Sequence, residues 1–118
     1  MRLKVYISGP ITRGCHIHNF SQAAEAQTQL IKAGFAPMNP MLSMMLPGAW
    51  NIPHEDWIEA DLPWVACADA VLRLPGESTG AETECRHAIQ HNIPVFRAKE
   101  YSDYLKTLEE WRDNRPVT

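Results

Sequence analysis

Short apolar runs alternate with helical segments along the whole chain, and this order restricts the folds that it can adopt. Four runs bounded by glycine, proline or polar residues are predicted strands, at residues 3–8, 35–38, 69–74 and 93–96. Helical periodicity predicts four helices between and after these strands. The first begins at Asn19 or Ser21 and ends at Gly34, and the others span 54–68, 81–91 and 101–111. Strands that alternate with helices make right-handed crossovers. The sequence therefore predicts an α/β fold with a four- to five-stranded, mainly parallel sheet and helices on both faces.

Length and composition exclude several classes of protein. The 118 residues predict one domain, spanning 1–118, with a single core. No apolar run approaches the ~18 residues that cross a bilayer, and we expect no signal peptide after Met1. The 11 basic residues are scattered among 14 acidic ones, which argues against a nucleic-acid polymer as partner. The 3 cysteines form no CxxC pair, which is typical of reduced thiols in the cytoplasm.

Two loops are expected beyond the carboxyl ends of the strands, where ligands bind in such folds. The first spans 9–14, where backbone N–H groups and the charge of Arg13 suit a phosphate. Turn glycines after a strand are common, so an ordinary turn explains this loop equally well. The second loop, 75–80, leads into a helix that Ser78 or Thr79 can cap.

The acidic residues at the start of that helix differ in how well capping explains them. Glu82 lies near the first turn, where a carboxylate is favoured by the helix dipole. Glu84 lies further in, on one face with Ala88 and His91, and is a candidate site residue. Glu84, His87 and His91 also have the spacing of a metal triad, but such histidines are more often surface residues. We expect neither a metal nor a cofactor, and a zinc hydrolase is the third alternative.

Asp61 is the second candidate carboxylate. It lies in a helical stripe with Trp57 and Trp64, and a carboxylate on an apolar face costs free energy unless it is paired or used. Asp69 has a simpler explanation, which is capping of the loop before the third strand. Pro63 predicts a kink in this helix or its division into two short helices.

The segment 37–53 contains four prolines and four of the five methionines, and we expect a long apolar loop without a helix. A loop of this kind is either a lid over a binding site or a flap that only covers the sheet. Together with Trp50, Trp57 and Trp64, it provides apolar surface that a second copy of the chain can cover. We therefore expect a homo-oligomer, a dimer or larger.

Three motifs follow one another along the chain. They are Val5-Tyr6-Ile7-Ser8-Gly9-Pro10, then Asp61 with Asp69 eight residues later, then Ser78-x-Gly80-x-x-x-Glu84 followed by Ala88. In this order and spacing they resemble the nucleoside 2-deoxyribosyltransferase-like superfamily, most closely its small DUF4406-type branch, over roughly residues 3–96. The resemblance implies a Rossmann-like (flavodoxin-like) three-layer sandwich. It also implies a small-molecule nucleoside or nucleotide as partner.

The resemblance assigns a role to each motif residue. Glu84 corresponds to the nucleophile at the anomeric carbon, Asp61 to the residue that handles the base or the catalytic proton, and Tyr6 to the tyrosine that positions nucleophile or sugar. Ser78 stands where the nucleotide N-hydrolases have a serine that contacts phosphate, whereas the nucleoside transferases have an aspartate. The other predicted substrate-binding residues come from the two loops and are Gly9, Ile11, Arg13 and Gly80.

Pro10 departs from the superfamily pattern. The nucleotide hydrolases have Gly-Ser at this point, and proline provides neither an N–H nor a hydroxyl to a phosphate.

The resemblance therefore implies cleavage or transfer of the N-glycosidic bond of a (deoxy)nucleoside or its 5′-monophosphate, through a covalent glycosyl-glutamate at Glu84. A carboxylate stabilises the oxocarbenium-like transition state and captures the sugar, and the leaving base needs a proton. The alternative, which the altered loop at Pro10 favours, is a nucleotide-binding module of the same fold that senses a ligand without cleaving it.

Overall fold

The computed structural model describes residues 1–98 and 103–116. Its described residues form one four-stranded parallel sheet in the order β2-β1-β3-β4. The strands are β1 (Lys4–Ser8), β2 (Ala36–Met38), β3 (Ala70–Arg73) and β4 (Val95–Arg97). The predicted α/β fold with a parallel sheet is confirmed.

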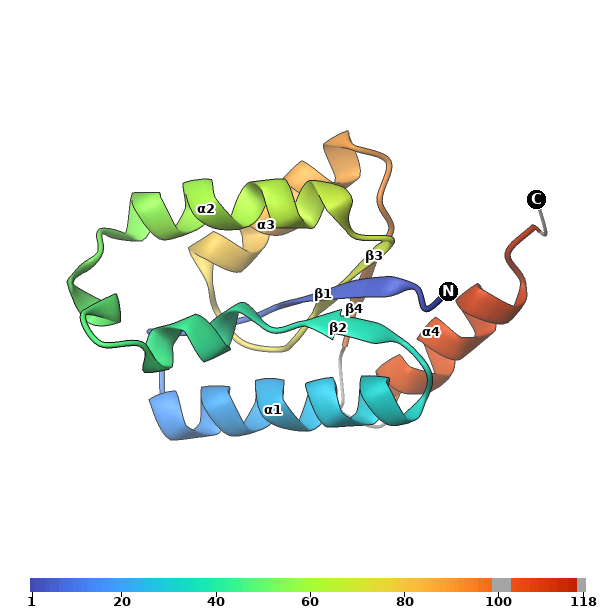
Figure 1. Cartoon of the computed structure of the whole chain (residues 1–118), viewed down its shortest axis with the longest axis horizontal. Coiled ribbons are helices and arrows are strands. Elements are labelled where there is room, and N and C mark those ends of the chain that lie inside the picture. The colour runs from blue at the N-terminus through green and yellow to red at the C-terminus, as the bar shows by residue number, and fades with distance from the viewer. Residues whose placement is uncertain (99–102, 117–118) are drawn as a thin grey trace.

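Helices cover both faces of the sheet, which gives three layers (Figure 1). They are α1 (His16–Lys32), α2 (His54–Cys67), α3 (Thr79–Gln90) and α4 (Asp103–Asp113). The last predicted helix includes Tyr101, which lies outside the described residues. None of the helices in the described ranges has the length and apolarity needed to span a membrane.

Alternate residues of β1 enter two separate cores, because successive side chains of a strand point to opposite faces. Val5 and Ile7 belong to the larger core, which also contains residues of α1 and α4. Tyr6 belongs to the smaller core, with Val65 of α2 and Cys85 of α3. The side of the sheet that Tyr6 faces is therefore the side covered by α2 and α3.

The expectation of a helix-free segment over 37–53 is wrong in part. Two short 3₁₀ helices occur there, η1 (Pro40–Met45) and η2 (Ala49–Asn51). Proline is tolerated in the first turn of a helix, where its missing N–H has no intrahelical partner. Pro40 occupies that place, and the Asn39 side chain caps the helix by accepting from the Met41 N–H at 3.0 Å.

Three contacts attach this segment to the helices on either side. Asn39 donates to Gln27 of α1 at 3.1 Å, and the His16 ring stacks on Trp50 with 5.0 Å between ring centroids. Trp57 of α2 donates its indole N–H to the carbonyl of Ala49 at 3.2 Å. The segment thus bridges α1 and α2 at the carboxyl end of the sheet (Figure 1).

One predicted helix boundary is also wrong. The first helix begins at His16, after Cys15, because the Asn19 side chain donates to the carbonyls of Ile11 and Arg13 instead of capping a helix.

Pro63 does not divide α2, which is continuous on both sides of it. Val65, two residues later, is fully buried in the smaller core. The expected apolar stripe on this helix is interrupted, since Trp64 is 59% exposed.

Candidate functional site

The site lies where the strand order reverses, between the carboxyl ends of β1 and β3, which is the usual ligand position in open α/β sheets. The loops after these strands meet at this point. Gly76 has a φ of +116°, and a Cβ there would lie 2.8 Å from Cγ of Pro10. Glycine is therefore required at 76 both for its backbone conformation and for the close approach of the two loops.

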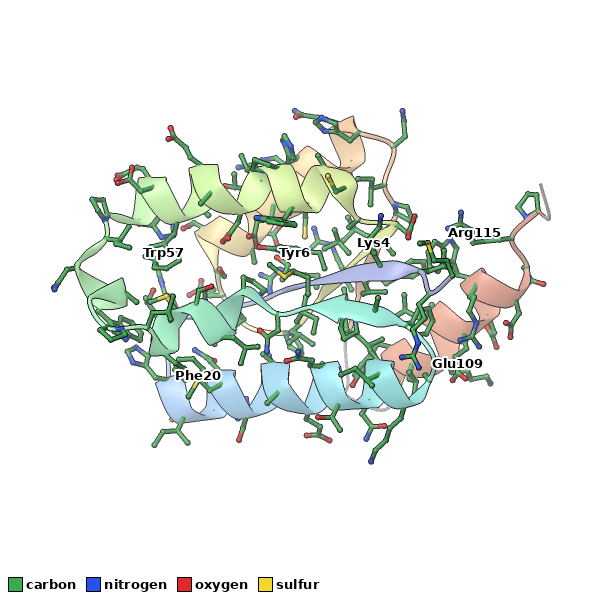
Figure 2. The ribbon with its side chains drawn as sticks, in the orientation of Figure 1. Lys4, Tyr6, Phe20, Trp57, Glu109 and Arg115 are labelled. Carbon is green, nitrogen blue, oxygen red and sulfur yellow. The ribbon has the colours of Figure 1, made fainter. Side chains whose placement is uncertain are left out.

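Glu84 is held at the base of the site by two hydroxyl groups from β1. Tyr6 Oη donates to Glu84 Oε2 at 2.6 Å, and Ser8 Oγ donates to Glu84 Oε1 at 2.7 Å. All three side chains are buried, with exposed fractions of 1%, 0% and 5% for Tyr6, Ser8 and Glu84. Figure 2 shows Tyr6 on the side of the sheet that faces α2 and α3.

Asp61 approaches the same group from α2 and interacts with the Tyr6 hydroxyl. Burial raises the pKa of Asp61 to about 6 and that of Glu84 to about 7, while the hydrogen bonds from Tyr6 and Ser8 oppose the rise at Glu84. Burial and the two nearby carboxylates raise the pKa of Tyr6, so its hydroxyl remains a proton donor. Two carboxyl groups that gain protons near neutral pH are thus joined through one tyrosine.

A cavity of about 70 Å³ opens above Glu84. It is bounded by the two loops, by α2 and by Met44 of η1, so the segment 40–45 covers the site. Its walls are Gly9, Ile11, Thr12, Met44, His54, Trp57, Ile58, Asp61, Ser78, Gly80, Ala81 and Glu84.

Of the two predicted caps, Ser78 and Thr79, it is Ser78 that caps α3, and its Oγ accepts the Ala81 N–H at 3.0 Å. This bond uses a lone pair of the hydroxyl oxygen, so the O–H can still be donated to a ligand. Ser78 lines both the Glu84 cavity and a neighbouring open cleft of about 300 Å³.

Gly80 lies against α2, and a Cβ there would be 3.0 Å from Ile58 Cδ1 and 3.2 Å from His54 Cε1. We expect Gly80→Ala to push these two side chains into the cavity and to weaken, at least tenfold in calorimetric titration, the binding of a ligand that occupies it. The free energy of unfolding should change by less than about 1 kcal/mol, because the higher helix propensity of alanine offsets the crowding of its Cβ against Ile58. Unchanged affinity would mean that the ligand does not enter this cavity.

Most of the predicted site residues come together, with one exception. Six of them line the cavity: Gly9, Ile11, Asp61, Ser78, Gly80 and Glu84. Tyr6 supports it from below through its hydrogen bond to Glu84. Arg13 does not line it. Arg13 forms an exposed ion pair with Glu77 at 3.1 Å beside the neighbouring cleft.

Sequence reasoning missed Ser8 and His54. Ser8 had a usable signal, because residues two apart on a strand share a face and Tyr6 had already been singled out. His54 had none, since only the packing of the α2 amino terminus against α3 brings it to the cavity.

The metal triad predicted as the third alternative does not form. Glu84 turns toward β1, whereas the His87 and His91 rings contact each other with 4.3 Å between centroids. Over residues 1–98 and 103–116, no three His, Cys, Asp or Glu side chains are placed to hold a metal ion. Asp69 has a structural role other than the expected capping of the loop before β3, because its side chain accepts the N–H of Lys4, the first residue of β1, at 2.7 Å.

Arg73 is a buried cation near this region, and its guanidinium binds other protein groups. Arg73 donates to Glu82 Oε1 at 3.2 Å, to the Gly76 carbonyl at 2.9 Å and to the Leu74 carbonyl. Glu82 is paired further with Arg97 at 2.9 Å, and these bonds lower its pKa to about 2. Arg73 therefore fixes the loop after β3, and Glu82 is part of that support.

Comparison with known proteins agrees with this architecture. The 2-deoxyribosyltransferase of the psychrotolerant bacterium Bacillus psychrosaccharolyticus is 17% identical, with a TM-score of 0.66 over 97% of this chain and 93% of that one. A conserved protein from Enterococcus faecalis V583 is 19% identical, with a TM-score of 0.65 over 97% and 77%. The CMP N-glycosidase of Clostridium botulinum is 14% identical, with a TM-score of 0.54 over 92% and 98%. At these identities the likeness shows the fold alone.

No curated protein matches the chain by sequence. A family model described as "Domain of unknown function (DUF4406)" matches residues 3–97, which is nearly the span of the resemblance drawn from the motifs. The chain belongs to the DUF4406 family, and it shares its fold with a 2-deoxyribosyltransferase and a CMP N-glycosidase.

Proposed function

We propose that this protein is an enzyme that cleaves or transfers the N-glycosidic bond of a (deoxy)nucleoside or its 5′-monophosphate. The observation that carries the proposal is the position of Glu84. It is a buried carboxylate at the floor of a cavity, fixed by two hydroxyls, with a second carboxyl group of raised pKa at Asp61. Enzymes that cleave a bond at an anomeric carbon commonly use two carboxyl groups, one as the nucleophile and one as the general acid.

In the proposed reaction Glu84 attacks the anomeric carbon while the bond to the base breaks. The electron pair of that bond leaves with the base, and Asp61 in its acid form donates a proton to it. The positive charge that develops on the sugar is stabilised by the Glu84 carboxylate, which then forms a glycosyl ester. Water or a second base attacks the ester and restores the free carboxylate.

Substrate entry requires movement around the cavity. Small-molecule sites usually have volumes of roughly 300–1,000 Å³, whereas the cavity above Glu84 has about 70 Å³. We infer that the wall formed by Met44 moves, because Met44 lies on the short helix η1 and is followed by the exposed side chains Met45 and Leu46. This geometry favours the lid over the flap for the segment 37–53.

The test is incubation of the protein with a panel of nucleosides and their 5′-monophosphates, followed by chromatography for free base or exchanged base. Release of base that depends on Glu84 supports the proposal. The non-catalytic alternative is favoured by Pro10, which provides no N–H to a phosphate. Binding of a nucleotide by calorimetry, without any base release across the panel, would establish that alternative.

Ser78 should determine the preference for a phosphate. Its free O–H and the amino terminus of α3 both favour an anion at this point. A hydrogen bond to a charged group is worth roughly 1.5–3 kcal/mol, so we expect Ser78→Ala to weaken monophosphate binding about ten- to a hundredfold. Binding of the unphosphorylated nucleoside should be nearly unchanged.

Calorimetric titration of both ligands against both proteins measures this preference. Thr83→Ala is the matched control, because Thr83 lines the neighbouring cleft but not the Glu84 cavity. Equal affinity of the wild type for the two ligands would contradict the nucleotide assignment and leave a nucleoside as the substrate.

A further inference from the structure

Ser8 has a place in the site that neither the motifs nor the comparisons assign. It is the last residue of β1 and is fully buried, and its hydroxyl lies 2.7 Å from Glu84 Oε1. Its second contact is longer, 3.5 Å to the Ala81 carbonyl. The short contact to a carboxylate is the stronger, charge-assisted bond.

Glu84 receives no direct bond from a cation within the described part of the chain. Its oxygens are bound by Tyr6 and Ser8, both neutral donors. Arg73 lowers the pKa of Glu84 only through its charge, because its guanidinium binds Glu82 and two carbonyls. Hydrogen bonding to the ionised form of Glu84 thus comes from two hydroxyl groups of one strand.

The two donors also fix the direction of the carboxylate. Tyr6 and Ser8 stand two residues apart on the same face of β1, a central strand of the sheet. Each binds a different oxygen, so rotation of the carboxylate about its terminal bond would break both hydrogen bonds. Each oxygen has a second lone pair, which leaves one of them available for attack on a ligand in the cavity.

We propose that Ser8 is a positioning residue that holds Glu84 through Oε1 and keeps its carboxylate aimed at the anomeric carbon. This inference rests on the proposed function for the identity of the reaction. It adds a residue to that function, with Tyr6 and Ser8 acting as a pair rather than Tyr6 alone.

The expected consequence of losing Ser8 is a slower reaction with nearly normal binding. Ser8→Ala should lower kcat for base release about ten- to a hundredfold, the scale of one hydrogen bond to a charged group. KM should change less than threefold, because Ser8 is not part of the cavity wall. Ser8→Thr keeps a hydroxyl on a residue that favours strands, and it should recover most of the rate.

A merely structural role would not change the titration of Glu84, so that is the second measurement. The groups that face Glu84 are Tyr6 from β1, Asp61 from α2 and Arg73 from β3, and none of them is altered by Ser8→Ala. Carbon-13 NMR of labelled glutamate carboxyls should place the Glu84 pKa of Ser8→Ala above the wild-type value, which lies at about 7. The control is Thr28→Ala, which removes a hydroxyl bonded to the Ala24 carbonyl on the exposed face of α1 and should change neither rate nor titration.

The outcomes separate this inference from the proposed function. If the wild type releases no base but Ser8→Ala still raises the pKa of Glu84, the proposed function fails and the contact between Ser8 and Glu84 stands. If base is released and Ser8→Ala changes neither kcat nor the Glu84 titration, while circular dichroism shows a native fold, the positioning role is wrong. Failure of Ser8→Thr to exceed Ser8→Ala in rate, with wild-type stability in denaturant unfolding, would also overturn it.

Discussion

Replacing Glu84 with glutamine is expected to abolish base release and, at the same time, to make the protein more stable above neutral pH. The loss of rate should be at least ~10,000-fold, the scale found when a covalent nucleophile is removed. An amide cannot form the glycosyl ester. It can still accept a hydrogen bond from Tyr6 or Ser8, so the fold should survive.

The gain in stability follows from the raised pKa of Glu84. Burial lifts the pKa from its ordinary value of 4.5 to about 7 in the folded protein. Below pH 4.5 the group is protonated in both folded and unfolded chains, and its contribution to stability is fully present. That contribution is lost as the pH rises toward 7, because the unfolded chain releases the proton more readily.

At pH 8 the full cost of ionising buried Glu84 is about 3 kcal/mol, since each pKa unit corresponds to 1.36 kcal/mol. Glutamine avoids this cost. We expect the free energy of unfolding of Glu84→Gln to exceed that of the wild type by about 1–3 kcal/mol at pH 8 and to be nearly equal at pH 4. Denaturant unfolding at the two pH values measures the difference, and exposed Glu59→Gln is the control that should show no such trend.

Two results would contradict this account. Base release near the wild-type rate would mean that Glu84 is not the nucleophile. Equal destabilisation of Glu84→Gln at pH 4 and pH 8 would mean that the carboxyl supports the fold and carries no cost of ionisation.

The fold and the centre of the site were predictable because both depend on short-range patterns. A run such as Val5-Tyr6-Ile7-Ser8 followed by glycine and proline is a strand and a turn in almost any context. Ser78 and Glu84 are six residues apart on a helix start, so their relation to each other is fixed once that helix forms. The parallel order of the strands then brings Glu84 to Tyr6.

Features that depend on contacts between distant segments were not predictable. The start of α1 is decided by the Asn19 side chain, which binds carbonyls of the preceding loop, and no helix-capping rule contains that information. The 3₁₀ helices of the 37–53 segment depend on anchoring to α1 and α2 through Trp50 and Trp57. Arg13 was placed at the site by charge alone, and Glu77 holds it outside the cavity.

Asp61→Asn should lower the rate of base release by about 100- to 10,000-fold for natural bases, the usual scale for a general acid. The acid role depends on the half-buried position of Asp61 on α2, which raises its pKa to about 6. Asparagine keeps the shape and the polar contact with Tyr6 but has no proton to give to a leaving base. The loss should therefore shrink for substrates whose base is a stable anion.

The pH dependence gives an independent measure of the same role. The reaction needs Glu84 ionised and Asp61 protonated, and burial raises both pKa values, to about 7 and about 6. The wild-type rate should therefore pass through a maximum between pH 6 and 7 and fall on both sides. In Asp61→Asn the fall at higher pH should disappear, so that the residual rate rises with pH and then levels off as Glu84 ionises.

Asp56→Asn is the matched control for this variant, because Asp56 is an exposed carboxylate in the first turn of the same helix. It should retain the wild-type rate and the wild-type pH profile. An equal loss of rate for good and poor leaving groups in Asp61→Asn would show that Asp61 orients the base without protonating it. In that case the fall at higher pH would also persist in the variant, because the group responsible for it would still be present.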